Sequence, residues 1–535
     1  MSQDTGPHRW GPPVLCLMLL AFALANALRV IPGSDWPWLY DACRDLGMAQ
    51  VILEGRYPQD NLYPEIALWF NPMTGALIAL GSLLSDIDPP RVSVLLGPWL
   101  NLLPALLFFL LARRWCGRWG AAAALAGYLL LNANALPTAS ATYTPWLFAG
   151  HLAVAPFCAA LWAFAVARAT PGYRFILLSG VLHGLTFLTH TGAAVVLGSI
   201  FCAVTLLNLI APAGVPRRKS LQALCIVLLT AFLTSLPYGG VLLFHHRLAV
   251  INIFPAINIE QPMHLAALRQ HLLASISLYN LVALIGFVGL LRFPRQPDQR
   301  RLTLAWGGVL LFWLAQGYLH QLQLPSISLV PAHHFHAALT LFRALCFGAG
   351  AVLLLTLLSR QLARLPLTAH APRLRLALCC LVVLIGFLPS ILHYLSWEEF
   401  RLNARQRAPY QGMWEQRGKV SAWLRENARP EEVTLCDDVL AVIAVGATGR
   451  GAAATMLIFS SPYVDAARRL TDRDMMFEAL RAKDPKLFTS LAKQYKVRYI
   501  LAAGAEERLV RAAGFPFVSV ILDEAPLTLY RVALP

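Results

Sequence analysis

The sequence is divided by a series of long apolar segments, each close to the roughly 20 residues that a helix needs to cross a bilayer. Only 13% of the 535 residues are charged, and 57% are hydrophobic. A soluble domain carries about 25% charged residues, so this composition excludes an ordinary soluble protein. We therefore predict a polytopic α-helical membrane protein with about 11–13 transmembrane helices. The candidate spans are residues 14–30, 69–85, 92–112, 119–136, 144–168, 174–190, 193–211, 221–243, 273–292, 303–320, 336–358 and 375–395.

Basic residues cluster in five connections, and all five lie on one side if the spans from residue 92 onward alternate in direction. Lysine and arginine collect in cytoplasmic loops, which places that side in the cytoplasm. The excess of 44 Lys and Arg over 28 Asp and Glu is thus explained without a nucleic-acid partner, and none is predicted. The clusters are Arg113, Arg114 and Arg118; Arg168 and Arg174; Arg217, Arg218 and Lys219; Arg292, Arg295, Arg300 and Arg301; and Arg360, Arg364, Arg373 and Arg375.

The first spans obey this rule only if residues 69–85 do not cross the membrane completely. That segment is short and contains Asn71-Pro72 and two glycines, which favour a re-entrant or interfacial position. Residues 14–30 are then an uncleaved first transmembrane helix, and the segment from residue 396 lies outside after about eleven crossings. If the basic rule fails locally, the chain crosses about twelve or thirteen times.

The composition changes after Arg401, where charges become frequent and strand-like segments alternate with helix-like ones. This alternation is typical of a small α/β domain. We predict a transmembrane module of residues 1–395 with an outer loop of residues 31–91, and an extracytoplasmic α/β domain of residues 396–535 that covers or braces the outer cavity. The Gly-rich stretch 445–451 lacks the spacing of a nucleotide-binding loop and is interpreted as a turn. The predicted strands are 433–436, 497–501, 517–522 and 527–532.

The outer loop after the first apolar segment is rich in carboxylates and aromatic residues. Apolar residues recur at helical spacing between Trp36 and Gly55, which predicts a helix lying along the membrane surface. A carboxylate beside this helix can act as a general base toward a substrate whose lipid tail stays in the bilayer. Asp35 and Asp41 are therefore the candidate catalytic residues. Alternatively, Asp35 favours the helix N-terminus, and Asp41 pairs with Arg44 or belongs to a solvated face.

Four further residues of this loop are candidates for lining a substrate site, namely Arg56, Tyr57, Asp60 and Glu65. They surround two Tyr-Pro pairs that could form a sugar subsite. Aromatic rings also gather at membrane–water interfaces, so an interfacial belt is the alternative interpretation of these rings.

Transfer of a sugar from a lipid phosphate to a hydroxyl also needs cations near the departing phosphate. Arg343 lies about two turns inside a predicted span, where a charge is costly and usually functional, and it is the preferred phosphate contact. Its alternative roles are snorkelling and pairing with the backbone. Of the fourteen histidines, only His8 and His370 fall in predicted cytoplasmic segments, so imidazoles gather on the outer side, where they can meet phosphate. The other phosphate-binding candidates are His333, His334, His245, His246 and Arg269, and His190 is a candidate for lining the substrate.

These features resemble the GT-C superfamily of polyprenyl-phosphate-dependent membrane glycosyltransferases, which includes protein O-mannosyltransferases, aminoarabinose transferases and oligosaccharyltransferase catalytic subunits. The resemblance implies an inverting transfer of a hexose or pentose from a polyprenyl-phosphate donor to an acceptor on the extracytoplasmic face of a bacterial inner membrane. It also implies that Asp35 acts as base or orients the acceptor. The similar motifs are Ser34-Asp35-Trp36, Gly55-Arg56-Tyr57-Pro58, Trp69-Phe70-Asn71-Pro72, Gly184–His190, Pro331–Phe335 and Ser461-Pro462-Tyr463-Val464-Asp465.

The chain departs from this family at one point. Many members carry a second acidic motif in the next outer loop, whereas residues 137–144 contain no carboxylate, so neither a metal nor another cofactor is predicted. The sugar and the acceptor, whether glycan, lipid or protein, are not specified. A transporter or flippase of a lipid-linked or anionic substrate is the alternative function, but it does not require an acidic, aromatic first loop. A polymerase or ligase of polyprenyl-linked glycans would place its largest outer loop late in the chain.

Overall fold

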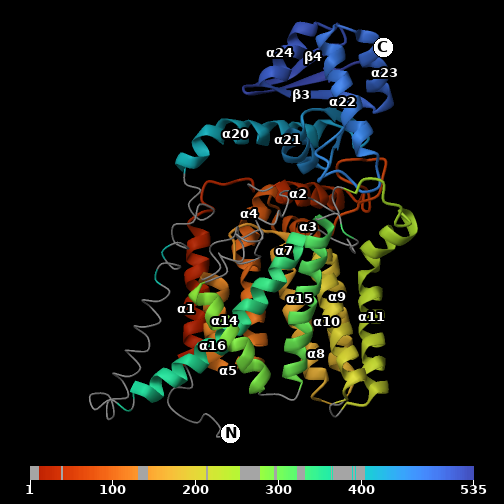
Figure 1. The fold of residues 1–535 in the computed structure, drawn as a ribbon. Coiled ribbons are helices and arrows are strands. Elements are labelled where there is room, and N and C mark those ends of the chain that lie inside the picture. The colour runs from red at the N-terminus through yellow and green to blue at the C-terminus, as the bar shows by residue number, and fades with distance from the viewer. Residues whose placement is uncertain are drawn as a thin grey trace.

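The computed structural model describes the helical bundle, the layer at its outer end and the C-terminal domain (Figure 1). The first helix begins near one end of the bundle, and the C-terminal domain stands beyond the opposite end, which we call the outer end. The described residues are 11–37, 40–130, 143–170, 172–212, 215–253, 277–294, 298–321, 324, 332–362, 364, 388, 392 and 404–534, and the predicted span 375–395 falls almost wholly outside them.

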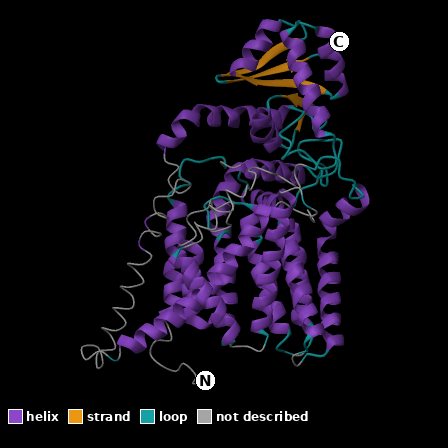
Figure 2. Cartoon of the chain, viewed as in Figure 1, coloured by secondary structure: helices purple, strands orange, loops and turns teal. Residues whose placement is uncertain are grey.

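The bundle consists of apolar helices that run between its two ends (Figures 1 and 2). In the described part of the chain, seven helices are long and apolar enough to cross a membrane, and shorter apolar helices pack among them. This confirms the predicted polytopic helical membrane protein. The bundle helices are α1 (Gly11–Leu28), α5 (Leu102–Leu130), α8 (Val154–Ala167), α9 (Arg174–Thr189), α10 (Thr191–Ile210), α11 (Arg217–Gly240), α14 (Leu278–Arg292), α15 (Gln299–Gln321) and α16 (His336–Leu362), and the single turn α7 (Ala149–Leu152) precedes α8.

Helix α5 is two helices joined by a sharp turn. At the turn Gly117 has φ of 76°, a left-handed conformation that glycine adopts without a Cβ clash. The Phe108 and Tyr128 rings on the two halves lie 5.2 Å apart, so the halves run side by side in opposite directions. The two predicted spans 92–112 and 119–136 correspond to this hairpin and to the helix before it, α4 (Pro89–Leu100).

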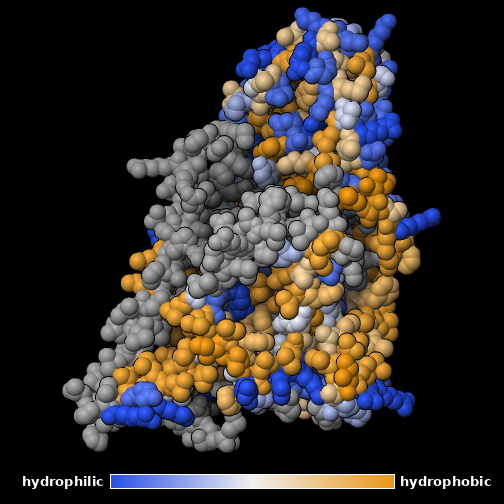
Figure 3. All heavy atoms as spheres, in the orientation of Figure 1, coloured by the Kyte–Doolittle hydropathy of each residue, from blue (hydrophilic) through white to orange (hydrophobic). Residues whose placement is uncertain are grey.

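The basic clusters meet at the end of the bundle opposite the C-terminal domain. Arg114 donates to the carbonyl of Ala165, and Arg168 pairs with Asp298 at 2.9 Å. Arg301 donates to Asn208, whose side chain also reaches Ser220 beside Lys219. These contacts bring four of the five clusters to one end, where Figure 3 shows a band of hydrophilic residues below the apolar belt.

The outer end is covered by a layer of short helices from the first loop (Figure 1). It consists of α2 (Tyr40–Leu53), α3 (Met73–Ser85) and α4. Helix α2 stops just before Gly55, whose φ is 68°, as the predicted glycine stop requires. Helix α3 lies across the bundle end and exposes Leu83 and Leu84, which agrees with the interfacial position predicted for residues 69–85.

The C-terminal domain contains all the described strands (Figure 2). Its five-stranded sheet has the order β2-β1-β3-β5-β4, with β1 parallel to β2 and β3, and with β5 antiparallel to β3 and β4. This confirms the predicted α/β class. The predicted turn 445–451 is a short 3-10 helix followed by left-handed Gly449, and its last residue begins β2, a strand that the sequence did not predict. The elements are α20 (Ala404–Asn427), β1 (Val433–Leu435), α21 (Asp438–Leu440), η4 (Ala441–Val445), η5 (Gly446–Thr448), β2 (Gly451–Ala452), α22 (Ala466–Arg481), α23 (Pro485–Gln494), β3 (Val497–Ala503), α24 (Gly504–Ala513), β4 (Val518–Glu524) and β5 (Leu527–Val532).

Helices α14 and α16 pack closely at a pair of glycines, one on each helix. A Cβ added at Gly286 would lie 1.8 Å from the carbonyl oxygen of Cys346, whereas a Cβ at Gly308 of α15 meets nothing within 4 Å. Because the obstacle at Gly286 is backbone, we expect Gly286→Ala to lower stability by about 1–3 kcal/mol, the usual cost of overpacking.

Gly308→Ala serves as the control and should leave stability equal or slightly higher, because alanine favours a helix more than glycine does. Thermal unfolding of both purified variants in the same detergent measures the difference. Equal melting temperatures for the two variants would contradict the glycine-mediated crossing.

Candidate active site

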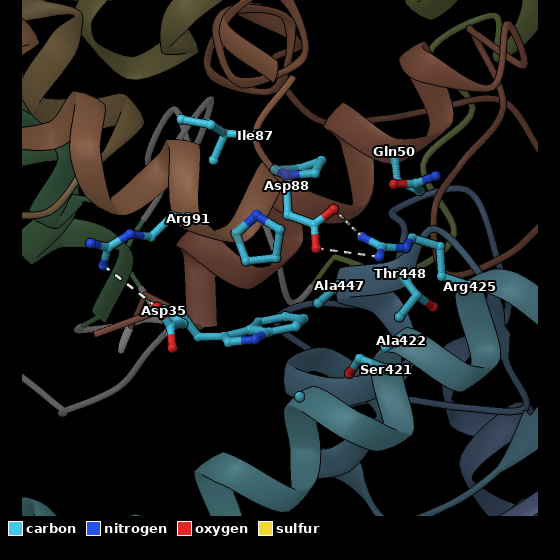
Figure 4. Close-up of a pocket in the computed structure, with 14 residues that line it drawn as sticks. Asp35, Gln50, Ile87, Asp88, Arg91, Ser421, Ala422, Arg425, Ala447 and Thr448 are labelled. Carbon is cyan, nitrogen blue, oxygen red and sulfur yellow. Dashed lines mark hydrogen bonds and ion pairs between the residues drawn. The ribbon is translucent and has the colours of Figure 1, made fainter. Parts of the chain in front are cut away.

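A pocket of about 380 Å³ lies between the membrane module and the C-terminal domain (Figure 4). Five segments of the chain form it: the turn after α1, Gln50 of α2, the start of α4, helix α20 and the end of η5. Trp36 lines the pocket, and its indole lies against Gly418 of α20. Because a Cβ at position 418 would approach that indole to 3.1 Å, a glycine there permits the close contact.

Asp35 lines this pocket at the position that the sequence predicted, directly after the first span. Its side chain is 81% exposed and lies 3.6 Å from the guanidinium of Arg91. Arg91 also donates to the carbonyl of Ser34 at 2.5 Å, which fixes the arginine beside the carboxylate. Asp35 is therefore open to a substrate and has one cation next to it.

A second carboxylate in the pocket, Asp88, was missed by the sequence analysis. It is 69% exposed and pairs with Arg425 of α20 at 3.4 Å, an interaction drawn in Figure 4. The available signal was Asp88-Pro89-Pro90, an acidic residue followed by two prolines, which marks the start of a helix inside the predicted outer loop. Nothing in the local sequence indicates that Arg425, 337 residues later, completes the pair.

Asp41, the other predicted catalytic residue, belongs to an ion-pair cluster on α2 and is not among the residues that line this pocket. Arg44 donates to Asp41 at 2.6 Å and to Asp45 at 3.2 Å, and its guanidinium lies 3.1 Å from the centre of the Phe70 ring. Asp45 is fully buried, and burial raises its pKa to about 6 despite Arg44. The alternative interpretation of Asp41 as a partner of Arg44 therefore describes its observed contact.

Three of the predicted substrate-lining residues connect the first loop to other parts of the chain. Arg56 donates to Glu54 and to the carbonyl of Gly449. The hydroxyl of Tyr57 donates to the carbonyl of Pro237 on α11 at 2.5 Å, and Glu65 pairs with Arg469. These contacts brace the loop, and none of the three residues lines the pocket around Asp35.

Asp60, the fourth of these residues, is buried inside the first loop. One carboxylate oxygen accepts the backbone N–H groups of Leu62 and Tyr63 at 2.8 and 2.9 Å. Burial raises the pKa of Asp60 to about 6, although these two bonds and nearby Arg469 act in the opposite direction. The contacts give Asp60 a structural role in shaping the loop.

The predicted phosphate-binding residues fall in two places. In the first place, His334 lies beside His190, a predicted substrate-lining residue, at the outer ends of α16 and α9, with ring centres 4.7 Å apart. Arg343 lies two turns further along α16, beside the ring of Tyr279 at 5.3 Å, and its buried Nε has no acceptor among the described residues. Asn71 of the first loop donates a hydrogen bond to the side chain of Thr191, which follows His190 in the chain. The first loop is therefore in contact with the region of these histidines.

His245 and His246 lie elsewhere, at the outer end of α11. The Nε2 atom of His246 is 3.1 Å from the carbonyl oxygen of Ala67, and its ring stacks on Tyr463 at 3.8 Å. Arg269 lies outside the described residues, as does the side chain of His333. Within the described part of the chain, no three His, Cys, Asp or Glu side chains gather as a metal site would require.

Comparison with solved structures shows which fold this is. The chain superposes on ArnT from Cupriavidus metallidurans bound to undecaprenyl phosphate with a TM-score of 0.56, 12% identity and coverage of 98% of both chains. It superposes on the oligosaccharyltransferase of Archaeoglobus fulgidus, tethered to an acceptor peptide, with a TM-score of 0.55, 12% identity and coverage of 98% of this chain and 74% of the other. The archaeal oligosaccharyltransferase AglB from Archaeoglobus fulgidus, in complex with an inhibitory peptide and a dolichol-phosphate, gives a TM-score of 0.52 at 11% identity, over 92% of this chain and 70% of the other. No family model and no curated protein sequence matches the chain. The likeness confirms the predicted GT-C-like architecture, a helical membrane module with a C-terminal α/β domain.

We expect the buried carboxyl group of Asp60 to make the free energy of unfolding depend on pH. Its folded pKa of about 6 lies above the ordinary value of 3.8, so the folded protein holds a proton that the unfolded chain releases between about pH 4 and 6. The stabilising contribution is present below pH 4 and is lost as the pH rises through 6. Asp60→Asn keeps an acceptor oxygen without the charge, so its stability relative to the native chain should rise by about 2–3 kcal/mol across this window.

Asp60→Ala, in contrast, leaves two buried N–H groups without an acceptor and should cost about 1–3 kcal/mol near pH 4, and this deficit should shrink as the native carboxyl ionises at higher pH. Melting temperatures of the native chain and both variants from pH 4 to 8 test the two statements. A constant difference between the native chain and Asp60→Asn across that range would contradict the buried, protonated carboxyl.

Proposed function

We propose that this protein is a membrane glycosyltransferase that moves a sugar from a polyprenyl-phosphate donor to an acceptor at the outer end of its bundle. The observation that carries the proposal is an exposed carboxylate, Asp35, in a pocket at the outer end of a fold that superposes over its full length on ArnT bound to undecaprenyl phosphate. The AglB complex with a dolichol-phosphate supports the same class of donor.

In this proposal Asp35 is the general base. The acceptor hydroxyl attacks the anomeric carbon of the sugar and gives its proton to the Asp35 carboxylate as the bond to the phosphate oxygen breaks. The result is a new glycosidic bond with inverted configuration, and the lipid phosphate leaves with its charge. Arg91, 3.6 Å from Asp35, orients the carboxylate.

We place the donor phosphate beside Arg343, His334 and His190. An arginine inside a span is costly unless it has a partner, and the Nε of Arg343 has no acceptor among the described residues. A phosphate there would stay at the bilayer level while its lipid tail remains in the hydrocarbon. Cations at that point stabilise the charge that develops on the leaving phosphate. His333 belongs to the same proposal by its position next to His334.

The proposed orientation follows the basic clusters. The end of the bundle that carries Arg114, Arg168 and Arg301 faces the cytoplasm by the positive-inside rule, so the pocket and the C-terminal domain lie on the extracytoplasmic side of the inner membrane. The acceptor would enter between α4 and α20, which supply the Asp88–Arg425 pair. The C-terminal domain thus forms one wall of the acceptor site.

The role of Asp35 is tested by transfer of labelled sugar from a panel of polyprenyl-phosphate donors in membranes. Asp35→Asn removes the base and keeps the shape, so transfer should fall by about 10²–10⁴-fold, the range for a lost general base. Asp86→Asn is the matched control, because Asp86 belongs to the same loop but does not line the pocket, and it should retain native activity.

Transfer that survives in Asp35→Asn would reject Asp35 as the base while keeping the enzyme. If the native chain transfers no sugar but moves labelled lipid across the bilayer, the protein is a flippase and the proposed function is wrong.

Arg343→Gln tests the phosphate site. Losing a charged hydrogen bond to phosphate costs about 1.5–3 kcal/mol, so the KM for the donor should rise about 10–100-fold, with the KM for the acceptor unchanged. Arg360→Gln, at the other end of the same helix, should leave both values as in the native chain. Steady-state kinetics with donor and acceptor varied separately give these values, and an unchanged donor KM in Arg343→Gln would contradict the placement.

A further inference from the structure

The chain forms a hook at the outer end of α11, comprising residues 241–253. It begins with a π-helical turn, η2 (Val241–His245). Arg247 and Leu248 then have φ of 52° and 54°, which reverses the direction of the chain. The N–H groups of His246 and Leu248 donate to the carbonyls of Val241 and Leu242, so the turn is closed by its own backbone bonds and leaves its apolar side chains free.

One face of the hook is apolar and open. Phe244 is 74% exposed and Ile251 62% exposed. Apolar side chains exposed in such a group mark an interaction surface. The remaining members of this face are Leu243, Leu248, Val250 and Ile253.

This face continues the lipid-facing side of the bundle. Leu229 and Leu233, one turn apart on the preceding helix α11, are exposed. Figure 3 shows the apolar belt rising along that side of the bundle toward the C-terminal domain. The exposed apolar surface of α11 therefore continues onto the hook, where His245 and Arg247 are exposed among the apolar side chains.

The opposite face of the hook holds both the C-terminal domain and the first loop. The N–H groups of Ile251 and Asn252 both donate to the carbonyl of Pro462, at 2.8 and 2.9 Å. The side chain of Asn252 donates to the carbonyl of Leu457 at 3.1 Å. His246 contacts the carbonyl of Ala67 and stacks on Tyr463.

We infer that the hook is an interfacial anchor, whose partner is the outer leaflet of the bilayer at the boundary between headgroups and acyl chains. Residues 241–253 contain no carboxylate and carry His245 and Arg247, a composition that suits an apolar surface seated below phosphate headgroups. Lipid on one face and hydrogen bonds on the other hold residues 456–463 of the C-terminal domain at the membrane surface. This inference is independent of the proposed catalytic activity.

Spin-label accessibility in vesicles of phosphatidylethanolamine and phosphatidylglycerol tests the anchor. A label on Phe244→Cys should be reached by oxygen and shielded from a water-soluble nickel complex, as in lipid. Val520→Cys is the control, because Val520 is 48% exposed on β4 in the C-terminal domain, and it should show the reverse order. Both cysteine variants are made in a background in which Cys202, Cys225, Cys379 and Cys380 are replaced by alanine. Cys202 and Cys225 are exposed in the spans and would otherwise be labelled as well.

A label at position 244 that is reached by the nickel complex as readily as the one at position 520 would overturn the inference. A label shielded from both reagents would also overturn it, because a protein surface would then cover the hook. Hydrogen exchange of residues 456–463 gives a second readout. In lipid the double variant Phe244→Asp/Ile251→Asp should exchange there at least tenfold faster than the native chain, and Val520→Asp should not, whereas equal exchange in all three proteins would remove the anchoring role.

Discussion

The outer end of this protein depends on one constraint: backbone groups that leave regular helices near a bilayer must still find hydrogen-bond partners. Side-chain amides and one imidazole meet that need. Asn101 donates to the carbonyls of Thr144 and Trp146, and Asn71 donates to that of Phe187. Asn252 and His246 serve the loops of the C-terminal domain and the first loop in the same way. His246, a predicted phosphate-binding residue, is thus among the residues that hold the irregular segments in place.

The carboxylates divide into two classes by burial, and the division bears on chemistry. Asp45 and Asp60 are buried, and burial raises the pKa of each to about 6, so they sit where no substrate hydroxyl can reach. Asp35 and Asp88 are exposed in one pocket, and each has a single arginine beside it. A base must lie within hydrogen-bond reach of the proton that it removes. Only the second class is open to a substrate, which is why we propose Asp35 and not a buried carboxylate as the base.

Sequence analysis predicted the features that depend on local pattern and length. Apolar length identified the spans, the basic clusters identified one end of the bundle, and helical spacing located α2 between Trp36 and Gly55. It could not assign Arg56, Tyr57 and Glu65, because their partners lie 180 to 404 residues away in the chain. The Asp88–Arg425 pair was missed for the same reason. A periodic pattern reports which face of an element is apolar, whereas the partner of a polar side chain is decided by tertiary packing.

The C-terminal domain is tied to the membrane module at the pocket itself. Arg417 of α20 is buried with its guanidinium 4.8 Å from the Trp36 ring and 3.6 Å from the sulfur of Cys43. On α2, Gly47 lies so close to Gly446 that an added Cβ would fall 1.9 Å from the carbonyl oxygen of Gly446. Such contacts leave little room for the domain to slide over α2. In the proposed reaction an acceptor would reach Asp35 through the gap between α4 and α20, where the exposed Asp88–Arg425 pair lies. Breaking that pair costs little, because exposed ion pairs contribute about 0–1 kcal/mol. The gap would then open for an acceptor while the contacts of Arg417 and Gly47 keep the domain in register.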